Sequence, residues 1–235
     1  MTDIHCHILP FVDDGSDSVE KSLEMLKDGL KQGVNKVICT PHLRGKAFNK
    51  TDEEIKAVFE DFKKEVERAE IPVEIYLGRE ITVYNGMIED LKNGKFLSMA
   101  GSKFVLLEFP YETETDVEEI CYNVKLLGLV PIVAHVERYS YLRDCESILR
   151  LRQLGAIIQI NASTLIEKVF PKERKFVKKL LKLRYVDIVA SDYHYVRKNC
   201  MAEAYAKVKS KYKDYADLIF DVNPTYIATC NNLTK

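Results

Sequence analysis

Seven short apolar segments recur along this chain, and their spacing constrains the fold more than any other feature of the sequence. Stretches with apolar residues at helical spacing separate them. Apolar strands that alternate with amphipathic helices are typical of a parallel sheet covered by helices. Seven such units predict a single-domain α/β protein, residues 1–235, that can close into a TIM-like (β/α)7 barrel. The segments lie at residues 3–7, 34–40, 73–80, 103–108, 130–135, 156–161 and 186–192.

Local signals place the ends of several helices. Asp17 or Ser18 can cap the first helix, and Thr51 begins a capping-box pattern ahead of a second, heavily charged one. A loop is predicted before it, at residues 44–49. Asn223 is placed to cap a last helix, with a proline in its first turn. Other helices are expected near residues 87–91, 116–127, 145–154, 171–184 and 202–212.

The composition excludes several classes of protein. The chain has 46% apolar residues, which is enough for a full core, and 35 basic against 36 acidic residues, which leaves a net charge of −1. A nucleic-acid partner is therefore not expected. We find no signal-peptide pattern and no apolar run long enough to cross a bilayer, so no membrane insertion is expected. Six cysteines without a CxxC pair suit a reduced, cytoplasmic protein.

All five histidines lie in short clusters with other metal-ligand residue types or at the ends of predicted strands. On a strand, the side chains at positions 5 and 7 point to one side, while Ile4 and Cys6 pack on the other. A single histidine at a strand end is more often structural than a metal ligand. Five in such positions indicate a metal site. They are His5, His7, His42, His135 and His194.

Carboxylates at the strand ends complete this set. The carboxyl ends of barrel strands meet at one rim, whereas an open doubly wound sheet would spread them along a line. Mixed imidazole and carboxylate ligands suit Mn, Fe or Zn better than Ca or Mg. Nine ligands exceed the needs of one ion and predict two or three divalent ions, with Glu80 as the first choice for a bridging carboxylate. The acids are Glu80, Glu108, Asp192 and a member of the Asp13-Asp14 pair.

Adjacent metal ions favour phosphoryl chemistry, because they activate water and stabilise charge on the attacking and leaving oxygens. Arg138 and Arg197 each follow a candidate histidine by three residues, where a guanidinium can hold phosphate oxygens; a surface ion pair is the competing interpretation of each arginine alone. A cysteine-nucleophile phosphatase needs five residues between Cys and Arg, and four separate Cys39 from Arg44. The chain also lacks a GxxxxGK[ST] loop and a GxSxG elbow.

These motifs resemble the PHP (polymerase and histidinol phosphatase) superfamily. Within it, the chain is most similar to the bacterial metal-dependent protein-tyrosine phosphatases that are encoded with capsule or exopolysaccharide genes. The resemblance covers nearly the whole chain in order. The matching motifs are the stretch at residues 3–10, Val12-Asp13-Asp14-Gly15, Thr40-Pro41-His42, His135-Val136-Glu137-Arg138-Tyr139, and Ser191-Asp192 followed by His194.

The resemblance implies a distorted barrel with up to three metal ions, usually manganese. It implies hydrolysis of phosphotyrosine on a cognate bacterial tyrosine kinase, which regulates capsule or exopolysaccharide synthesis. Arg138 and Arg197 would contact phosphate. Our leading hypothesis for the reaction is that a metal-activated hydroxide attacks phosphorus, while a metal-bound water, His42 or His194 assists the leaving phenolate. Asp14 is preferred to Asp13 from the similarity alone. The implied metal ligands are His5, His7, Asp14, His42, Glu80, Glu108, His135, Asp192 and His194.

The sequence departs from the usual family pattern at Phe11, Leu43 and Tyr193. These residues are expected to reshape the mouth of the pocket without removing a ligand. Two alternative functions are a small-molecule phosphomonoesterase, such as a histidinol phosphatase, and a non-catalytic, metal-stabilised module that docks a membrane kinase. A PHP-type nuclease is disfavoured by the neutral charge balance.

Overall fold

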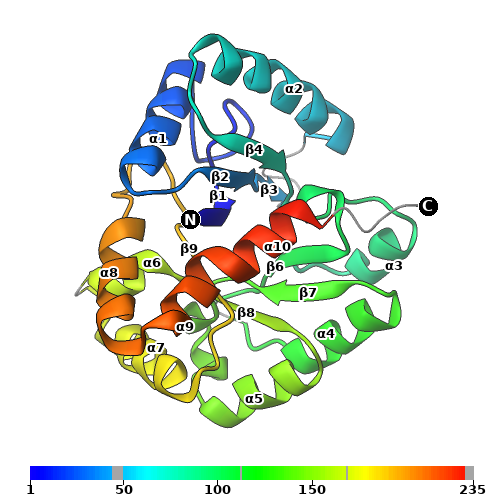
Figure 1. Cartoon of the computed structure of the whole chain (residues 1–235). Coiled ribbons are helices and arrows are strands. Elements are labelled where there is room, and N and C mark those ends of the chain that lie inside the picture. The colour runs from blue at the N-terminus through cyan, green and yellow to red at the C-terminus, as the bar shows by residue number, and fades with distance from the viewer. Residues whose placement is uncertain (44–49, 112, 168, 231–235) are drawn as a thin grey trace.

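The computed structural model describes residues 1–43, 50–111, 113–167 and 169–230, so the loop expected at residues 44–49 lies outside the described residues. Strands occupy the centre and helices surround them (Figure 1). Every paired strand is parallel to its neighbour, as the sequence predicts. The strands are β1 (Thr2–Cys6), β2 (Lys36–Cys39), β3 (His42–Leu43), β4 (Glu74–Leu77), β5 (Glu80–Thr82), β6 (Phe104–Glu108), β7 (Val130–Val133), β8 (Ile157–Asn161) and β9 (Ile188–Ala190).

The strands form two sheets that follow one another around a ring. One sheet has the order β1-β2-β4, and the other has the order β3-β5-β6-β7-β8-β9. On one side, Cys6 forms an isolated parallel bridge with Tyr193, just beyond β9, and the His7 N–H donates to the Tyr193 carbonyl at 2.9 Å. On the other side, the chain passes directly from β2 to β3 and from β4 to β5. The carboxyl ends of the strands therefore face a common region.

One of the seven predicted strands is broken into two. The strand expected at residues 34–40 is present as β2, and Pro41, which has no N–H to donate to a ladder, separates it from the additional short strand β3. A continuous strand at residues 73–80 was also expected, and this expectation is wrong. That segment divides into β4 and β5, so Glu80 begins a strand in the larger sheet instead of ending a longer one.

Close packing and a buried ion pair fix this break. A Cβ atom on Gly78 would lie 2.9 Å from the Met99 sulfur and 3.3 Å from the Met99 Cα atom, so a larger residue would require the neighbouring segment to shift. The next residue, Arg79, is buried and forms an ion pair with Asp52 at the start of the second helix. Its guanidinium also donates to the Lys50 carbonyl at 2.9 Å. These contacts anchor the bend that places the following residue, Glu80, at the rim.

The predicted helix caps are present at the first two helices. Ser18 accepts a hydrogen bond from the Lys21 N–H, and Thr51 forms a capping box with Glu54. Asn223 is not a cap, because the chain reaches it in helical conformation from a π-helical turn at Leu218–Val222. The helices are α1 (Val19–Lys31), α2 (Asp52–Arg68), α3 (Met87–Lys92), α4 (Val117–Leu126), α5 (Cys145–Gln153), α6 (Ala162–Ile166), α7 (Pro171–Leu183), α8 (Met201–Tyr212), α9 (Asp214–Asp217) and α10 (Asn223–Thr229).

The core contains the apolar faces of the strands and helices. β6 is buried along its whole length. Cys6, Cys39 and Cys121 are buried and free, and burial raises the pKa of the Cys39 and Cys121 thiols to about 12. They are therefore protonated packing residues. Among the described helices, none combines the length and the apolar character needed to cross a membrane.

Candidate metal centre and active site

The five histidines converge on one buried cluster from distant parts of the chain. His5 lies in β1, His7 immediately follows it, and His42 begins β3, while His135 and His194 follow β7 and β9. The His7 ring centroid is 5.4 Å from that of His5, 4.3 Å from that of His42 and 4.1 Å from that of His194. The His135 ring lies 5.5 Å from His5. The structure thus brings together all the histidines that the sequence places near one rim.

Glu80 lies at the centre of this cluster, where its carboxylate faces four imidazole rings. Its Oε1 atom is 3.0 Å from His135 Nε2 and 3.3 Å from His5 Nε2. Its Oε2 atom is 2.7 Å from His42 Nδ1 and 3.4 Å from His7 Nε2. Both oxygens therefore face nitrogens of the ligand type, which is the arrangement expected of a carboxylate shared between two cations.

Two aspartates border the cluster on other sides. Asp14 Oδ1 lies 3.4 Å from His42 Nε2 and 3.4 Å from His194 Nε2. Asp192 Oδ1 lies 3.5 Å from His7 Nε2 and 3.7 Å from His194 Nδ1. Asp192 is buried, whereas the Asp14 side chain is 47% exposed and faces a cavity. The cluster is therefore accessible from the side of Asp14.

Glu108, the last residue of β6, lies near two of the histidines. Its Oε1 atom is 3.8 Å from His135 Nε2, and its Oε2 atom is 4.0 Å from His42 Nδ1. The Thr82 hydroxyl donates to Oε2 at 2.8 Å, and the Tyr111 hydroxyl donates to Oε1 at 2.6 Å. These two hydrogen bonds orient the carboxylate toward the cluster.

The donor set fits divalent metal ions. Three overlapping groups have ligand-type atoms that all lie within 4.8 Å of one another. Within the described part of the chain, Glu80 Oε2 and His194 Nε2 are buried and lie near ligand-type atoms, but neither makes a hydrogen bond of good geometry. Such atoms are costly to bury unless a cation meets them. The groups are His7-Asp14-His42-His194, His5-His7-Glu80 and His42-Glu80-Glu108.

Electrostatics favour the ligand forms of the carboxylates and of His135. Burial alone would lower the pKa of His5 and His7, but the neighbouring carboxylates raise it, so these two rings favour the protonated form as long as no cation replaces their protons. Burial alone would raise the pKa of Glu80, but the surrounding histidines hold it well below its usual range. Burial would also raise the pKa of Asp192, but His7 and Arg138 hold it well below that range. Burial lowers the pKa of His135, and the Arg138 charge adds to this effect. Charged carboxylates and a neutral imidazole are the forms that bind metal.

Three residues that the sequence reasoning did not assign to the site hold the outer nitrogens of the histidine rings. Each contact fixes the rotation of one ring so that its Nε2 atom faces the cluster. Asp13 was the rejected member of an acidic pair, while no spacing signal marks the other two. The pairs are Asp13 Oδ2 with His7 Nδ1 at 2.7 Å, Gln159 Oε1 with His5 Nδ1 at 3.2 Å, and the Tyr139 hydroxyl with His135 Nδ1 at 3.2 Å.

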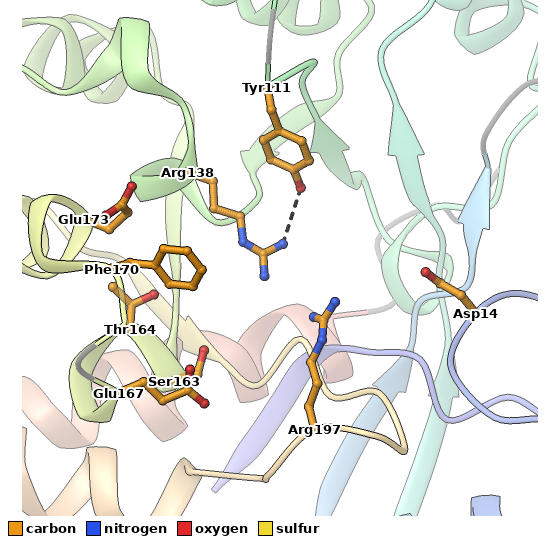
Figure 2. A pocket seen from close by; sticks show the side chains of 9 residues that line it. All are labelled: Asp14, Tyr111, Arg138, Ser163, Thr164, Glu167, Phe170, Glu173 and Arg197. Atoms are coloured by element: carbon orange, nitrogen blue, oxygen red, sulfur yellow. Dashed lines mark hydrogen bonds between the residues drawn. The ribbon is translucent and has the colours of Figure 1, made fainter.

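Arg138 and Arg197 both reach the Asp192 carboxylate at the edge of the cluster. Arg138 Nη2 donates to Asp192 Oδ2 at 2.6 Å, and Arg197 Nη1 donates to the same oxygen at 3.1 Å. Figure 2 shows both guanidinium groups extending into one cavity of about 450 Å³. The cavity is lined by Asp14, Tyr111, Arg138, Ser163, Thr164, Glu167, Phe170, Glu173 and Arg197.

The aromatic wall of this cavity differs from the one expected. Phe11, Leu43 and Tyr193 were expected to shape the pocket mouth, but none of them lines the cavity of about 450 Å³. Tyr193 lines a second cavity that shares Ser163, Glu167 and Arg197 with the first. Phe11 instead projects from the surface, 60% exposed and with a φ of 64°. Tyr111 and Phe170, which the sequence reasoning did not single out, supply the aromatic side chains (Figure 2).

A parallel α/β ring with buried histidines and carboxylates at its strand ends is the arrangement of metal-dependent hydrolases with a distorted barrel fold. A zinc-containing histidinol phosphate phosphatase from Lactococcus lactis shares the fold, with a TM-score of 0.59, 12% identity and coverage of 93% of this chain and 94% of that one. One chain among the crystal structures of YwqE from Bacillus subtilis and CpsB from Streptococcus pneumoniae, metal-dependent tyrosine phosphatases, gives a TM-score of 0.89 at 27% identity. It covers 97% of this chain and 94% of that one. The predicted distorted barrel is confirmed.

Comparison of sequences identifies the family within this class. The model of the CpsB/CapC family of capsular polysaccharide synthesis matches residues 1–229. The tyrosine-protein phosphatase CpsB of Streptococcus agalactiae is 34% identical over 233 residues, 95% of this chain and 96% of that protein. YwqE of Bacillus subtilis is 33% identical over 200 residues, 84% of this chain and 78% of that protein. The chain belongs to the CpsB/CapC family, the metal-dependent, PHP-type tyrosine-protein phosphatases tied to capsule synthesis.

Proposed function

We propose that this protein hydrolyses phosphotyrosine on a bacterial tyrosine kinase and thereby regulates capsule or exopolysaccharide synthesis. The observation that carries the proposal is the meeting of two guanidinium groups with the histidine and carboxylate cluster at one cavity. Membership of the CpsB/CapC family supports the tyrosine phosphatase chemistry. We also propose that the chain acts as one domain in the cytoplasm, where its six free cysteines would stay reduced.

We propose that the cluster holds two or three divalent ions, with manganese as the first choice and iron or zinc as alternatives. When bound, the ions would supply an activated water and positive charge for the phosphoryl oxygens. Asp14 is the better ligand of the acidic pair, because Asp13 is engaged by the outer nitrogen of His7. The proposed ligands are His5, His7, Asp14, His42, Glu80, Glu108, His135, Asp192 and His194.

Arg138 and Arg197 are proposed to hold the non-bridging phosphate oxygens in the cavity. Guanidinium groups suit this role because they can donate two parallel hydrogen bonds to a phosphate. Burial alone would lower the pKa of Arg138, but Asp192 and Tyr111 raise it, so the side chain stays cationic. His42 and His194 lie beside Asp14, and a metal-bound water or whichever of these rings does not hold a metal ion would assist the departing phenolate. Phenolate leaves readily, so weak assistance is sufficient.

Metal removal tests the proposed chemistry directly. We expect thorough stripping with a chelator to lower hydrolysis of p-nitrophenyl phosphate to about a hundredth or less of its initial rate, and Mn²⁺ to restore it. Metal content by mass spectrometry and the hydrolysis rate should fall together. Full activity in metal-free protein would contradict the proposal.

The same preparation separates the alternative functions. Cleavage of histidinol phosphate far faster than of a phosphotyrosine peptide would indicate a small-molecule phosphatase. A melting temperature that rises with metal, without hydrolysis of any phosphoester, would indicate a metal-stabilised binding module. Faster cleavage of the phosphotyrosine peptide is the result that we expect.

Phe170 provides a test of the tyrosine substrate. Its ring points into the cavity near Arg138 and is 57% exposed, so it can pack against a phosphotyrosine ring (Figure 2). Aromatic pairs contribute about 0.5–1.5 kcal/mol beyond area burial, so Phe170→Ala should raise KM for a phosphotyrosine peptide about 3- to 10-fold. Hydrolysis of glycerol phosphate, which has no ring, should be unchanged. The matched control is Tyr122→Ala at an exposed position of α4, which should leave KM for both substrates unchanged. An equal rise in KM for both substrates in Phe170→Ala, or any rise in the control, would argue against this contact.

A further inference from the structure

The charge of this protein is strongly segregated, although the whole chain is nearly neutral. Residues 171–213 contain 13 Lys or Arg and four Asp or Glu residues, whereas the rest of the chain contains 22 and 32. The balance of −1 therefore combines a region of about +9 with a remainder of about −10. The neutral net charge suggests that the protein has no surface for polyanions, but this region is positive enough to attract one.

Five of the 13 basic residues of this region lie on one face of α7. Phe176, Val177, Leu180 and Leu181 form the buried face of that helix. Five lysines at helical spacing lie on the opposite side and are all exposed, and we call them the α7 lysine stripe. They are Lys172, Lys175, Lys178, Lys179 and Lys182.

The stripe has no internal counter-charge. None of its five ammonium groups forms an ion pair or a hydrogen bond with another residue in the described ranges. Glu173 is the only acidic residue of α7, and it is paired with Arg143. Five neighbouring like charges on one helix repel one another, so a complementary anion would relieve an unfavourable arrangement.

The stripe lies on the same helix as residues of the candidate active-site cavity. Phe170 and Glu173, at the start of α7, line that cavity (Figure 2). Glu173 lies on the side of the helix that carries Phe176 and Val177, and the stripe lies on the opposite side. The stripe extends from Lys172 to Lys182, about 15 Å at 1.5 Å per residue. An extended peptide covers this distance in about four or five residues. A protein whose phosphotyrosine occupied the cavity would therefore pass around the first turn of α7, and its next residues would lie along the stripe.

We propose that the α7 lysine stripe binds an acidic segment of the phosphoprotein substrate, next to the phosphotyrosine. This inference rests on the proposed function. Continuity with the cavity favours a peptide over an anionic membrane, because the first turn of the same helix lines the catalytic pocket. The stripe would select substrates with Asp or Glu clustered a few residues from the phosphotyrosine, and it would act mainly on KM and on the association rate.

The test compares two phosphotyrosine peptides, one with four flanking Glu residues and one with four flanking Ser residues. The variant carries Lys178→Glu, Lys179→Glu and Lys182→Glu, changes that preserve helix propensity. Wild-type protein should prefer the acidic peptide about tenfold in kcat/KM, and the variant should lose this preference. Hydrolysis of p-nitrophenyl phosphate should be unchanged. The preference should also weaken when salt rises from about 0.05 M to 0.5 M.

A matched control carries Lys56→Glu, Lys63→Glu and Lys64→Glu on exposed positions of α2, which lies on another side of the molecule (Figure 1). It should keep the preference for the acidic peptide. No preference in the wild type, or a preference that survives in the α7 variant, would overturn the inference. A third result would assign the lysines to a membrane instead. In that case the wild type and the α2 control co-sediment with phosphatidylserine vesicles, the α7 variant does not, and kcat/KM for both peptides is the same in all three proteins.

A separate measurement distinguishes failure of this inference from failure of the proposed function. If no phosphotyrosine peptide is hydrolysed, the proposed function fails. Fluorescence anisotropy of the acidic peptide with an unphosphorylated tyrosine then still decides whether the stripe binds it. Binding that weakens in the α7 variant but not in the α2 control supports the stripe as an acidic-segment site, and equal binding by all three proteins rejects it.

Discussion

Glu80→Gln is expected to remove metal from the centre and to lower turnover of a phosphotyrosine peptide by about a thousandfold. The two oxygens of Glu80 lie within 3.4 Å of ring nitrogens on four histidines. Glutamine keeps the size of the side chain, but it removes the negative charge and turns an NH2 group toward the cluster. A thousandfold loss corresponds to about 4 kcal/mol, in the range of metal-ion stabilisation of a transition state. Metal content and kcat measure the two effects.

Glu74→Gln is the matched control for this change. Glu74 lies on β4, its side chain is exposed, and it forms an ion pair with Lys36 outside the cluster. We expect its metal content and turnover to remain within about twofold of the wild type, as for most surface changes. Circular dichroism should show folded protein for both variants. A Glu80→Gln protein with full metal content and turnover would show that Glu80 does not bridge the ions.

The features of the fold that depend on neighbouring residues in the sequence were predictable. Caps at Ser18 and Thr51 and the alternation of apolar segments depend on neighbouring residues, and the structure contains them. The break between β4 and β5 was not predictable from periodicity. It depends on Gly78 packing against Met99 and on Arg79 pairing with Asp52, which are contacts between distant parts of the chain.

The meeting of the histidines was predictable for a geometric reason. In a parallel ring, residues at the ends of different strands share one rim whatever the details of packing. This geometric relation holds even where a predicted strand is broken, so Glu80 reaches the cluster from the start of β5. The relation does not predict how each imidazole ring is rotated about its side-chain bonds. The contacts of Asp13 and Gln159 with the outer imidazole nitrogens therefore appear only in the structure.

The cavity walls were the least predictable part of the site. Tyr111 lies beyond the end of β6, and Phe170 immediately precedes α7. Loop conformations of this kind follow from tertiary contacts and leave no periodic signal. Tyr111 shows the consequence, because its hydroxyl donates to Glu108 and accepts a hydrogen bond from Arg138 at 3.3 Å (Figure 2). One loop residue thus connects a candidate metal ligand with a candidate phosphate-binding residue.

Arg138→Ala is expected to leave bound metal unchanged and to lower turnover on the order of a hundredfold, as for loss of one preorganised donor to transition-state charge. The guanidinium lies in the cavity and reaches Asp192 at 2.6 Å. Arg197 reaches the same carboxylate at 3.1 Å, so Asp192 keeps a cationic partner in the variant. Metal analysis combined with steady-state kinetics on a phosphotyrosine peptide measures both outcomes.

Two further variants separate the charge of Arg138 from its geometry. Arg138→Lys keeps a positive charge but loses the planar fork, so we expect about a tenfold loss, between those of wild type and Arg138→Ala. Arg150 lies on the outer side of α5 and pairs with Glu118, so Arg150→Ala should leave both metal content and turnover unchanged. If Arg138→Ala loses metal, Arg138 acts by holding Asp192 in place and not by binding phosphate. Turnover would then return when the protein is saturated with Mn²⁺, whereas loss of a phosphate contact cannot be restored by added metal.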